Sequence, residues 1–145
     1  MSELTLCHAE SDNEVAACFP VMALLRPGLA SADELVRRVA RQRGSGYLIL
    51  AAWRHNTAVA LAGYRVEENL IHGRFTYVDD LVTMEGERRG GIGARLLEAV
   101  GRHGREQGCQ RLVLGTALDN VLAHRFYYRQ GLVARGLRFM RPIEE

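Results

Sequence analysis

The sequence predicts a mixed α/β fold of the α+β type, in which helices pack on the faces of a mixed sheet. Three observations carry this prediction. β-rich apolar runs follow one another in the middle of the chain, amphipathic helical patterns flank them on both sides, and no linker, internal repeat or low-complexity segment interrupts the 145 residues. A chain of this length closes one substantial core, so we expect a single domain over residues 1–145.

The N-terminal third predicts one short strand followed by two helices. The strand is a weakly alternating stretch, and each helix begins at a serine followed by acidic residues, a pattern typical of helix caps. A Pro-Gly pair ends the first helix and a glycine ends the second. In order, these elements are expected at Leu4 to His8, Ser11 to about Leu25, and Ser31 to Gly44.

Three β-rich apolar runs predict the middle of the sheet. The first two are separated by four polar residues, so they predict a hairpin. The third continues the meander after a polar loop near Glu67 to Gly73. The runs are Tyr47 to Trp53, Ala58 to Val66, and Phe75 to Thr83.

The C-terminal third alternates helices with short strands. Ile92, Leu96, Leu97 and Val100 have helical spacing and predict a helix that begins at a glycine-rich turn and ends at Gly108. The remaining elements are a short strand at Arg111 to Thr116, a helix capped by Asp119 or Asn120 that runs to about Arg129, and a last strand or hairpin within Leu132 to Ile143.

The composition excludes several classes of protein. The net charge of +2, with 48% hydrophobic and 25% charged residues, is ordinary for a soluble globular chain. No stretch approaches the roughly 20 apolar residues of a membrane span and no signal-peptide pattern opens the chain, so we expect a cytoplasmic protein without a membrane partner. Three cysteines without a C-x-x-C pair indicate free thiols and no metal site. Arginines beside acids on a helical pattern indicate a solvated helix face, so we expect no nucleic-acid partner.

The glycine-rich turn between a strand and a helix, Arg88 to Gly93, is the strongest functional signal. Backbone N–H groups at such a turn, together with a helix N-terminus, bind phosphate oxygens. A Walker loop is excluded because no lysine follows the glycines. A dinucleotide-binding fingerprint is disfavoured because the third glycine and the ribose-binding acid are absent. A tight turn without a ligand is the structural alternative.

The pattern Arg-x-x-Gly-x-Gly, here Arg88, Gly91 and Gly93, resembles the pyrophosphate-binding motif of the GNAT superfamily of N-acyltransferases. The strand Tyr77 to Thr83, just before the glycines, is similar to that family's central splayed strand. The resemblance implies a single N-acetyltransferase domain with a largely antiparallel central sheet and helices on both faces. It also implies a splay between the central strand and the strand after the glycine-rich helix.

A second signature lies downstream, at the expected separation from the first. Asn120, with Ala three positions on and Tyr seven positions on, followed by Gly131, is similar to the family's second motif. Leu132 replaces the usual phenylalanine, which affects packing more than chemistry. The resemblance spans about residues 45 to 135, and the N-terminal third carries no matching motif.

The resemblance implies acetyl-CoA as cosubstrate and no metal. Backbone N–H groups of the glycine turn would hold the pyrophosphate, with two arginines adding positive charge. The edge of the central strand would pair with the pantetheine amides, and the Leu81 amide is a candidate oxyanion donor. Asn120 would bind the pantetheine arm, cap its own helix, or do both. The expected cofactor-binding residues are Leu81, Val82, Thr83, Arg88, Arg89, Gly90, Gly91, Ile92, Gly93, Ala94 and Asn120.

N-acetylation of an amine needs a neutral nucleophile, a stabilised oxyanion and a proton for the departing thiolate. Tyr127 occupies the family's general-acid position, and its structural alternative is a packed helix tyrosine beside Phe126. Tyr128 lies one residue further round the helix and should face elsewhere. Tyr127 is therefore the expected acid and Tyr128 its control.

Strand alternation predicts that Asp79 and Asp80 point to opposite faces. Asp79 shares the face of Tyr77, the position where some relatives with a similar strand carry a catalytic glutamate, so the resemblance makes Asp79 the preferred base or amine anchor. Asp80 and an ordered water chain are the alternatives. Glu67 and Glu68 are further candidates for contacting a cationic amine, or simply exposed acids. Arg26 would meet an anionic group of the substrate or remain solvated.

We expect direct transfer of an acetyl group from acetyl-CoA to an amine on a small molecule or a protein, in a ternary complex. The alternative is a non-catalytic acyl-CoA-binding sensor or regulatory protein of the same fold. A nucleotide-dependent oxidoreductase is disfavoured for the reasons given above. A two-fold homodimer is the default expectation for a small enzyme, although no residue indicates it.

Overall fold

The chain divides after Gly115 into two compact units, which we describe one at a time. The computed structural model describes residues 3–143. The first unit holds the sheet and the helices before Gly115, and the second holds one helix and the C-terminal segment. The expectation of a single N-acetyltransferase domain over residues 1–145 stays a prediction.

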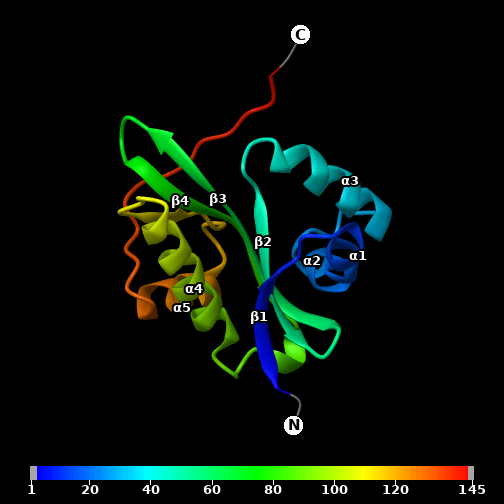
Figure 1. Cartoon of the computed structure of the whole chain (residues 1–145). Helices are drawn as coiled ribbons and strands as arrows, with labels where there is room; N and C mark the ends of the chain where they lie inside the picture. The colour runs from blue at the N-terminus through cyan, green and yellow to red at the C-terminus, as the bar shows by residue number, and fades with distance from the viewer. Residues whose placement is uncertain (1–2, 144–145) are drawn as a thin grey trace. The chain divides into compact units, whose positions relative to one another are not determined.

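The first unit is built on a five-stranded sheet with the order β1-β2-β3-β4-β5 (Figure 1). The first four strands pair antiparallel with their neighbours, and β5 pairs parallel to β4. The predicted mixed, largely antiparallel sheet is therefore confirmed. The strands are β1 (Leu4–His8), β2 (Leu48–Arg54), β3 (Thr57–Asn69), β4 (Gly73–Thr83) and β5 (Leu112–Leu114).

Helices cover both faces of the sheet, as expected (Figure 1). Three N-terminal helices lie on one face, where their apolar residues pack with Ile49 and Leu61 of the sheet. The longest helix lies on the other face and buries its predicted apolar stripe of Ile92, Leu96 and Val100. The helices are α1 (Asp12–Ala17), α2 (Phe19–Leu25), α3 (Ala32–Arg43) and α4 (Ile92–Glu106), with a 3-10 turn, η1, at Glu85–Glu87.

The single helix predicted from Ser11 to Leu25 is wrong, because the chain forms α1 and α2 with a break at Cys18. Pro20 lies at the start of α2, and proline has no N–H to continue the hydrogen-bond ladder of a preceding helix. The predicted caps are confirmed. Ser11 accepts a hydrogen bond from the Glu14 amide and Ser31 accepts one from the Glu34 amide, each at 3.1 Å.

The predicted hairpin between β2 and β3 is confirmed and turns at His55 and Asn56. The polar loop predicted from Glu67 to Gly73 is shorter than expected, because β3 continues through Asn69 and pairs with the start of β4. Glu67 and Glu68 are therefore strand residues. The tip of this second hairpin exposes the side chains of Leu70 and Ile71.

The pairing of β3 with β4 contains a bulge at Asp79. Gly63 pairs with Asp80 and Tyr64 pairs with Val78, so Asp79 is an extra residue on β4. A bulge leaves its extra residue out of the ladder and changes the direction of the side chains around it. This irregularity lies in the middle of the predicted site.

The second unit contains α5 (Val121–Arg129), which begins as predicted after Asn120. The strand or hairpin predicted within Leu132 to Ile143 is wrong for the described residues, which form no regular element. A strand needs a hydrogen-bonded partner, and the described part of this unit contains no other extended element to supply one. Phe139 and Met140 accordingly stay exposed.

Within residues 3–143 no helix combines the length and the apolar character that crossing a bilayer requires.

Candidate functional site

The glycine turn lies between η1 and α4, as the motif predicts. Gly91 is the N-cap of α4 and has a left-handed backbone with φ of 74°, which favours glycine. Among the described residues no side chain caps this helix, so the N–H groups of its first turn face outward without a side-chain partner. The turn can therefore bind a phosphate through its backbone.

The side chains of the turn divide into an exposed and a buried set. Arg88 and Arg89 are exposed, and Arg88 Nε approaches the Thr83 carbonyl at 3.4 Å. The Ile92 side chain is buried in the core, so only the backbone of this residue is available to a ligand. The turn thus offers two guanidinium groups and the backbone amides after Gly90, whose own N–H donates to the Glu87 carbonyl at 3.2 Å. The turn residues are Arg88, Arg89, Gly90, Gly91, Ile92, Gly93 and Ala94.

The edge of β4 opens beyond Val78. β5 pairs with β4 only from Thr76 to Val78, so in the described structure the next residues of β4 have a strand partner on the β3 side alone. This is the predicted splay between the central strand and the strand after the glycine-rich helix.

The register shows which amides face the open edge. Met84 N–H donates to the Val59 carbonyl of β3 at 2.8 Å, and N–H groups alternate between the two edges of a strand. Leu81 and Thr83 therefore present their amides to the open edge, whereas the Val82 amide faces β3. The expected oxyanion donor, Leu81, thus has its N–H on the side where a ligand strand would add.

The prediction that Asp79 and Asp80 point to opposite faces is wrong, because the bulge interrupts the alternation on which it was based. Both carboxylates contact side chains from the face covered by α2 and α3. We call the connected group the carboxylate network, and it consists of Arg26, Gln42, Tyr47, Arg65, Asp79 and Asp80.

Asp80 is held by two donors. Arg26 Nη2 lies 2.8 Å from Oδ1, and the Tyr47 hydroxyl donates a 2.6 Å hydrogen bond to Oδ2. Burial, followed by the charge of Asp80, raises the pKa of Tyr47 far above its usual range, so the phenol stays protonated and donates. Arg26, read from the sequence as meeting a substrate anion or staying solvated, is instead paired with a carboxylate of its own chain.

Asp79 is less fully engaged. Arg65 Nε donates a 2.9 Å hydrogen bond to Oδ2, while Oδ1 accepts none from the described residues. Arg65 is itself fixed by the Gln42 side chain at 2.8 Å and stacks over the Tyr47 ring. Burial raises the pKa of Asp79, and the Arg65 charge opposes that rise. Asp79 therefore has one carboxylate oxygen available and a proton affinity above that of an exposed aspartate.

Two further predicted residues lie in the second unit. The Asn120 side chain accepts a hydrogen bond from the Ala123 amide at 3.2 Å, so the capping role is confirmed. Burial raises the pKa of Tyr127, whose ring meets Phe126 edge to face. The Tyr128 side chain is 57% exposed, whereas Tyr127 is partly buried, so the two side chains have different surroundings, as expected. The approach of Asn120 and Tyr127 to the residues of the first unit stays a prediction.

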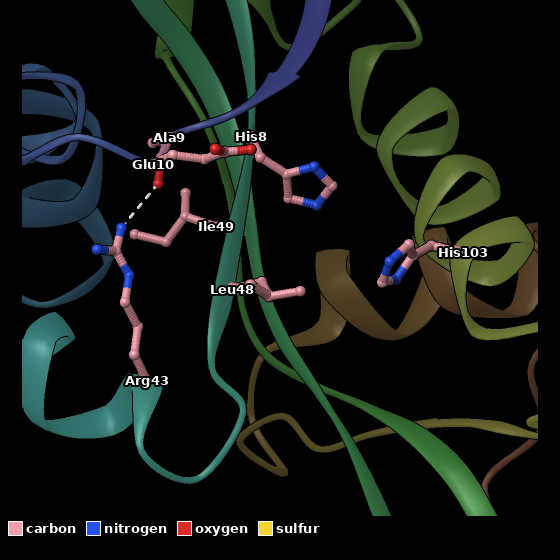
Figure 2. Close-up of a pocket in the computed structure, with 7 residues that line it drawn as sticks. All are labelled: His8, Ala9, Glu10, Arg43, Leu48, Ile49 and His103. Atoms are coloured by element: carbon pink, nitrogen blue, oxygen red, sulfur yellow. Dashed lines mark hydrogen bonds between the residues drawn. The ribbon is translucent and has the colours of Figure 1, made fainter. Parts of the chain in front are cut away.

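A cavity of about 360 Å³ lies elsewhere in the first unit, between the end of β1 and α4 at His103 (Figure 2). None of the predicted site residues lines it. Its lining residues are His8, Ala9, Glu10, Arg43, Leu48, Ile49 and His103.

Beside this cavity the Tyr64 hydroxyl joins two imidazoles, 2.7 Å from His8 Nε2 and 3.1 Å from His103 Nδ1. The sequence gives one indication of this cluster. A tyrosine in a buried apolar run needs a partner for its hydroxyl.

Four residues at this site were not predicted from the sequence: Gln42, Tyr47, Gly63 and Arg65. Gly63 was the detectable signal, because an isolated glycine inside a strand pattern indicates a bulge or a close approach of other groups. Within residues 3–143 no group of three or more His, Cys, Asp and Glu side chains is arranged to hold a metal ion.

Comparison with known proteins agrees with this geometry. Residues 14–132 match the family described as the Acetyltransferase (GNAT) family. A Bacillus subtilis (strain 168) protein described as "Uncharacterized N-acetyltransferase YhdJ" is 28% identical over 134 residues, which covers 92% of this chain and 94% of the relative.

Two solved structures show the same fold. Aminoglycoside N-acetyltransferase AAC(6')-Iy in complex with CoA superposes with a TM-score of 0.86 at 16% identity, covering 98% of this chain and 96% of that one. Glucosamine-6-phosphate N-acetyltransferase from Arabidopsis thaliana has a TM-score of 0.78 at 18% identity, covering 98% and 99%. Because the family match spans most of the residues, the chain belongs to the GNAT family of acetyltransferases and is an acyl-CoA-dependent enzyme.

Proposed function

We infer that this enzyme moves an acetyl group from acetyl-CoA to an amine by direct transfer in a ternary complex. The observation that carries the proposal is the open edge of β4, where the Leu81 and Thr83 amides face away from β3 shortly before the glycine turn. An extended ligand adds to such an edge as a further strand while its phosphates meet the helix N-terminus. The pantetheine arm and pyrophosphate of coenzyme A have this combination of groups.

The reaction needs three protein groups. The amine lone pair attacks the thioester carbonyl, a C–N bond forms, and the carbonyl oxygen becomes an oxyanion that accepts a hydrogen bond from the Leu81 amide. Such a donor typically contributes about 100- to 1000-fold to turnover. As the intermediate collapses, the C–S bond breaks and the Tyr127 phenol gives its proton to the thiolate of coenzyme A. Asp79 takes the proton that the amine loses.

The charge around Asp79 favours a cationic acceptor. In the carboxylate network, the charges of Asp79 and Asp80 balance those of Arg26 and Arg65. Glu67, which lies 4.0 Å from Arg65 outside the network, adds one net negative charge. An ammonium group would be attracted to the free Asp79 oxygen and would lose its first proton to water, which leaves the neutral nucleophile. Asp79 then accepts the one proton that nitrogen releases as the amide forms. Asp79 therefore serves as anchor and base in the same position.

The relatives support an amine acceptor of small size. Two of the superposed structures are named for an aminoglycoside and for glucosamine 6-phosphate, both amine-bearing small molecules. We carry over only the class, an amine on a small molecule, with a protein amine as the second option. We further expect a cytoplasmic, homodimeric enzyme that needs neither metal nor nucleic acid.

Thermal unfolding with acetyl-CoA, NADH and ATP tests the first half of this proposal. A ligand that binds only the folded chain at 100 times its dissociation constant stabilises it by about 2.7 kcal/mol. We expect acetyl-CoA alone to raise the melting temperature. A rise with NADH and none with acetyl-CoA would refute the proposed coenzyme site.

An amine panel with detection of the released thiol tests the second half. We expect thiol release that depends on one class of cationic amine. Binding of acetyl-CoA without thiol release from any amine would instead indicate the alternative, a non-catalytic acyl-CoA sensor of the same fold.

A further inference from the structure

Both carboxylate oxygens of Asp80 are held by donors from distant parts of the chain. Arg26 contacts Oδ1 and the Tyr47 hydroxyl contacts Oδ2. The Asp80 side chain is 12% exposed and its bond to Tyr47 is partly buried, whereas the Arg26 side chain is 51% exposed. A carboxylate held in this way cannot turn toward a substrate without leaving two donors unpaired, which is costly in a buried site. Asp80 therefore stabilises the framework of the site.

The bond between Tyr47 and Asp80 depends on a missing side chain. A Cβ atom added to Gly63 would overlap the Tyr47 hydroxyl and clash with the Asp80 carboxylate. The φ of Gly63 is not positive, so glycine is needed here for space and not for its backbone freedom. Three separate segments thus converge on one hydrogen bond.

Arg26 also bonds the bulge itself. Its Nη2 donates a 2.8 Å hydrogen bond to the main-chain carbonyl of Asp79, the extra residue on β4. A bulged residue lies outside the strand ladder, and its carbonyl needs another donor. Arg26 supplies that donor, and its Nε donates a 2.9 Å hydrogen bond to Oδ1 of Asp80. The loop after α2 is thereby joined to the residue that the reaction uses.

We propose that Arg26 and Tyr47 are positioning residues for Asp79. Together they saturate Asp80 and bond the main chain of the bulge, and the bulge determines where the free carboxylate oxygen of Asp79 meets the acceptor amine. The effect on catalysis rests on the proposed function, in which Asp79 anchors and deprotonates that amine. Coenzyme binding should not depend on these two residues, because the coenzyme meets backbone groups further along the chain.

Tyr47→Phe tests the proposal with a change of one hydroxyl, and Tyr64→Phe is its matched control. Tyr64 is also buried and its hydroxyl also makes hydrogen bonds, but to imidazoles next to α4 and not to the carboxylate network. Both variants should lose stability. Only Tyr47→Phe should raise the KM for the amine found in the panel, by about tenfold, with acetyl-CoA affinity within about twofold of the parent. Arg26→Gln, at a half-exposed side chain, provides a second variant should Tyr47→Phe not fold.

Amide hydrogen exchange supplies a readout that needs no acceptor. The Val82 amide faces β3 just beyond the bulge. Relative to the exchange of buried α4 amides, which reports global stability, its exchange should accelerate about tenfold in Tyr47→Phe and keep the parent ratio in Tyr64→Phe. Unchanged Val82 exchange in Tyr47→Phe, or equal losses of acceptor and coenzyme affinity, overturns the inference. If the parent enzyme binds no acetyl-CoA, the proposed function is overturned by that separate measurement. The exchange result would still decide whether Arg26 and Tyr47 hold the bulge.

Discussion

Arg65 donates a hydrogen bond of 2.9 Å from Nε to Oδ2 of Asp79 across the β3–β4 pair. The two residues act on the proton affinity of the site in opposite directions. Burial of Asp79 raises the pKa of its carboxyl group, and the Arg65 guanidinium lowers it. The balance leaves the pKa above its ordinary value, which suits a group that must accept a proton from an ammonium.

Arg65→Gln should move the acidic limb of the kcat/KM profile to higher pH. Loss of the positive charge removes the influence that lowers the Asp79 pKa, so the base is protonated, and inactive, at a pH where the parent still turns over. The measurement is kcat/KM from pH 5 to 9 with the amine found in the panel. Arg43→Gln is the control, because Arg43 bonds the Ala9 carbonyl and lies outside the carboxylate network. An unshifted acidic limb in Arg65→Gln would show that Asp79 is not the base.

Gly91→Ala should destabilise the protein by about 1–2 kcal/mol, the cost of a left-handed conformation for a residue with a side chain. Nothing lies within 4 Å of a Cβ at this position, so the cost is conformational and not steric. Because Gly91 directs the first turn of α4, acetyl-CoA affinity should fall as well. Both effects are measured by melting temperature with and without acetyl-CoA.

Gly101→Ala is the matched control for Gly91→Ala. Gly101 lies inside α4, has no neighbour within 4 Å of a Cβ and does not have a positive φ. Alanine in a helix interior is about 0.5–1 kcal/mol more stable than glycine, so this variant should melt higher and bind acetyl-CoA normally. Equal destabilisation by both substitutions would contradict the role assigned to the Gly91 backbone.

Local patterns were sufficient to predict the glycine turn and α4. The turn needs a residue with free backbone conformations, and the helix needs an apolar stripe, so Gly91 and the spacing from Ile92 to Val100 predicted both. Pro20 is an equally local signal, and it indicates the break between α1 and α2. Long, strongly periodic segments are the part of a fold that sequence patterns describe best.

The carboxylate network could not be predicted in the same way. Strand alternation assumes a regular ladder, whereas the bulge at Asp79 depends on the space at Gly63 and on donors from Arg26 and Tyr47, which are far apart in the chain. Long-range contacts of this kind leave almost no local pattern. The place of Asp79 on the strand was enough to make it a candidate site residue. The residues that bond it could not be predicted from the strand pattern.

Tyr127→Phe should lower kcat by about 100- to 10,000-fold while acetyl-CoA affinity stays near that of the parent. The reason is that the phenol proton is needed only when the thiolate departs, after the coenzyme has bound. Tyr128→Phe, at a 57% exposed side chain on the same helix, should leave both parameters unchanged. Equal turnover in the Tyr127 variant and the parent would remove the general-acid assignment.

The imidazoles on either side of Tyr64 predict a loss of stability in acid. Burial, and then the nearby charge of His103, lower the pKa of His8, while Glu10 acts in the opposite direction. The folded pKa thus lies below the ordinary value of 6.5, so the unfolded chain binds the proton more readily. The stabilising contribution of neutral His8 is complete above that value and is lost as the pH falls below it. Protonation also makes both ring nitrogens of His8 donors, so the imidazole can then meet the Tyr64 hydroxyl only as a donor.

Urea unfolding at pH 7.5 and at pH 5.5 measures this contribution, with His8→Gln as the test variant. The parent should lose more stability between the two pH values than His8→Gln does, because glutamine carries no titrating group at the same position. His55→Gln is the control, since His55 is exposed in the β2–β3 turn and should leave the parent's pH dependence intact. If His8→Gln lost as much stability as the parent between pH 7.5 and 5.5, the acid sensitivity would have to come from groups other than the imidazole that bonds Tyr64.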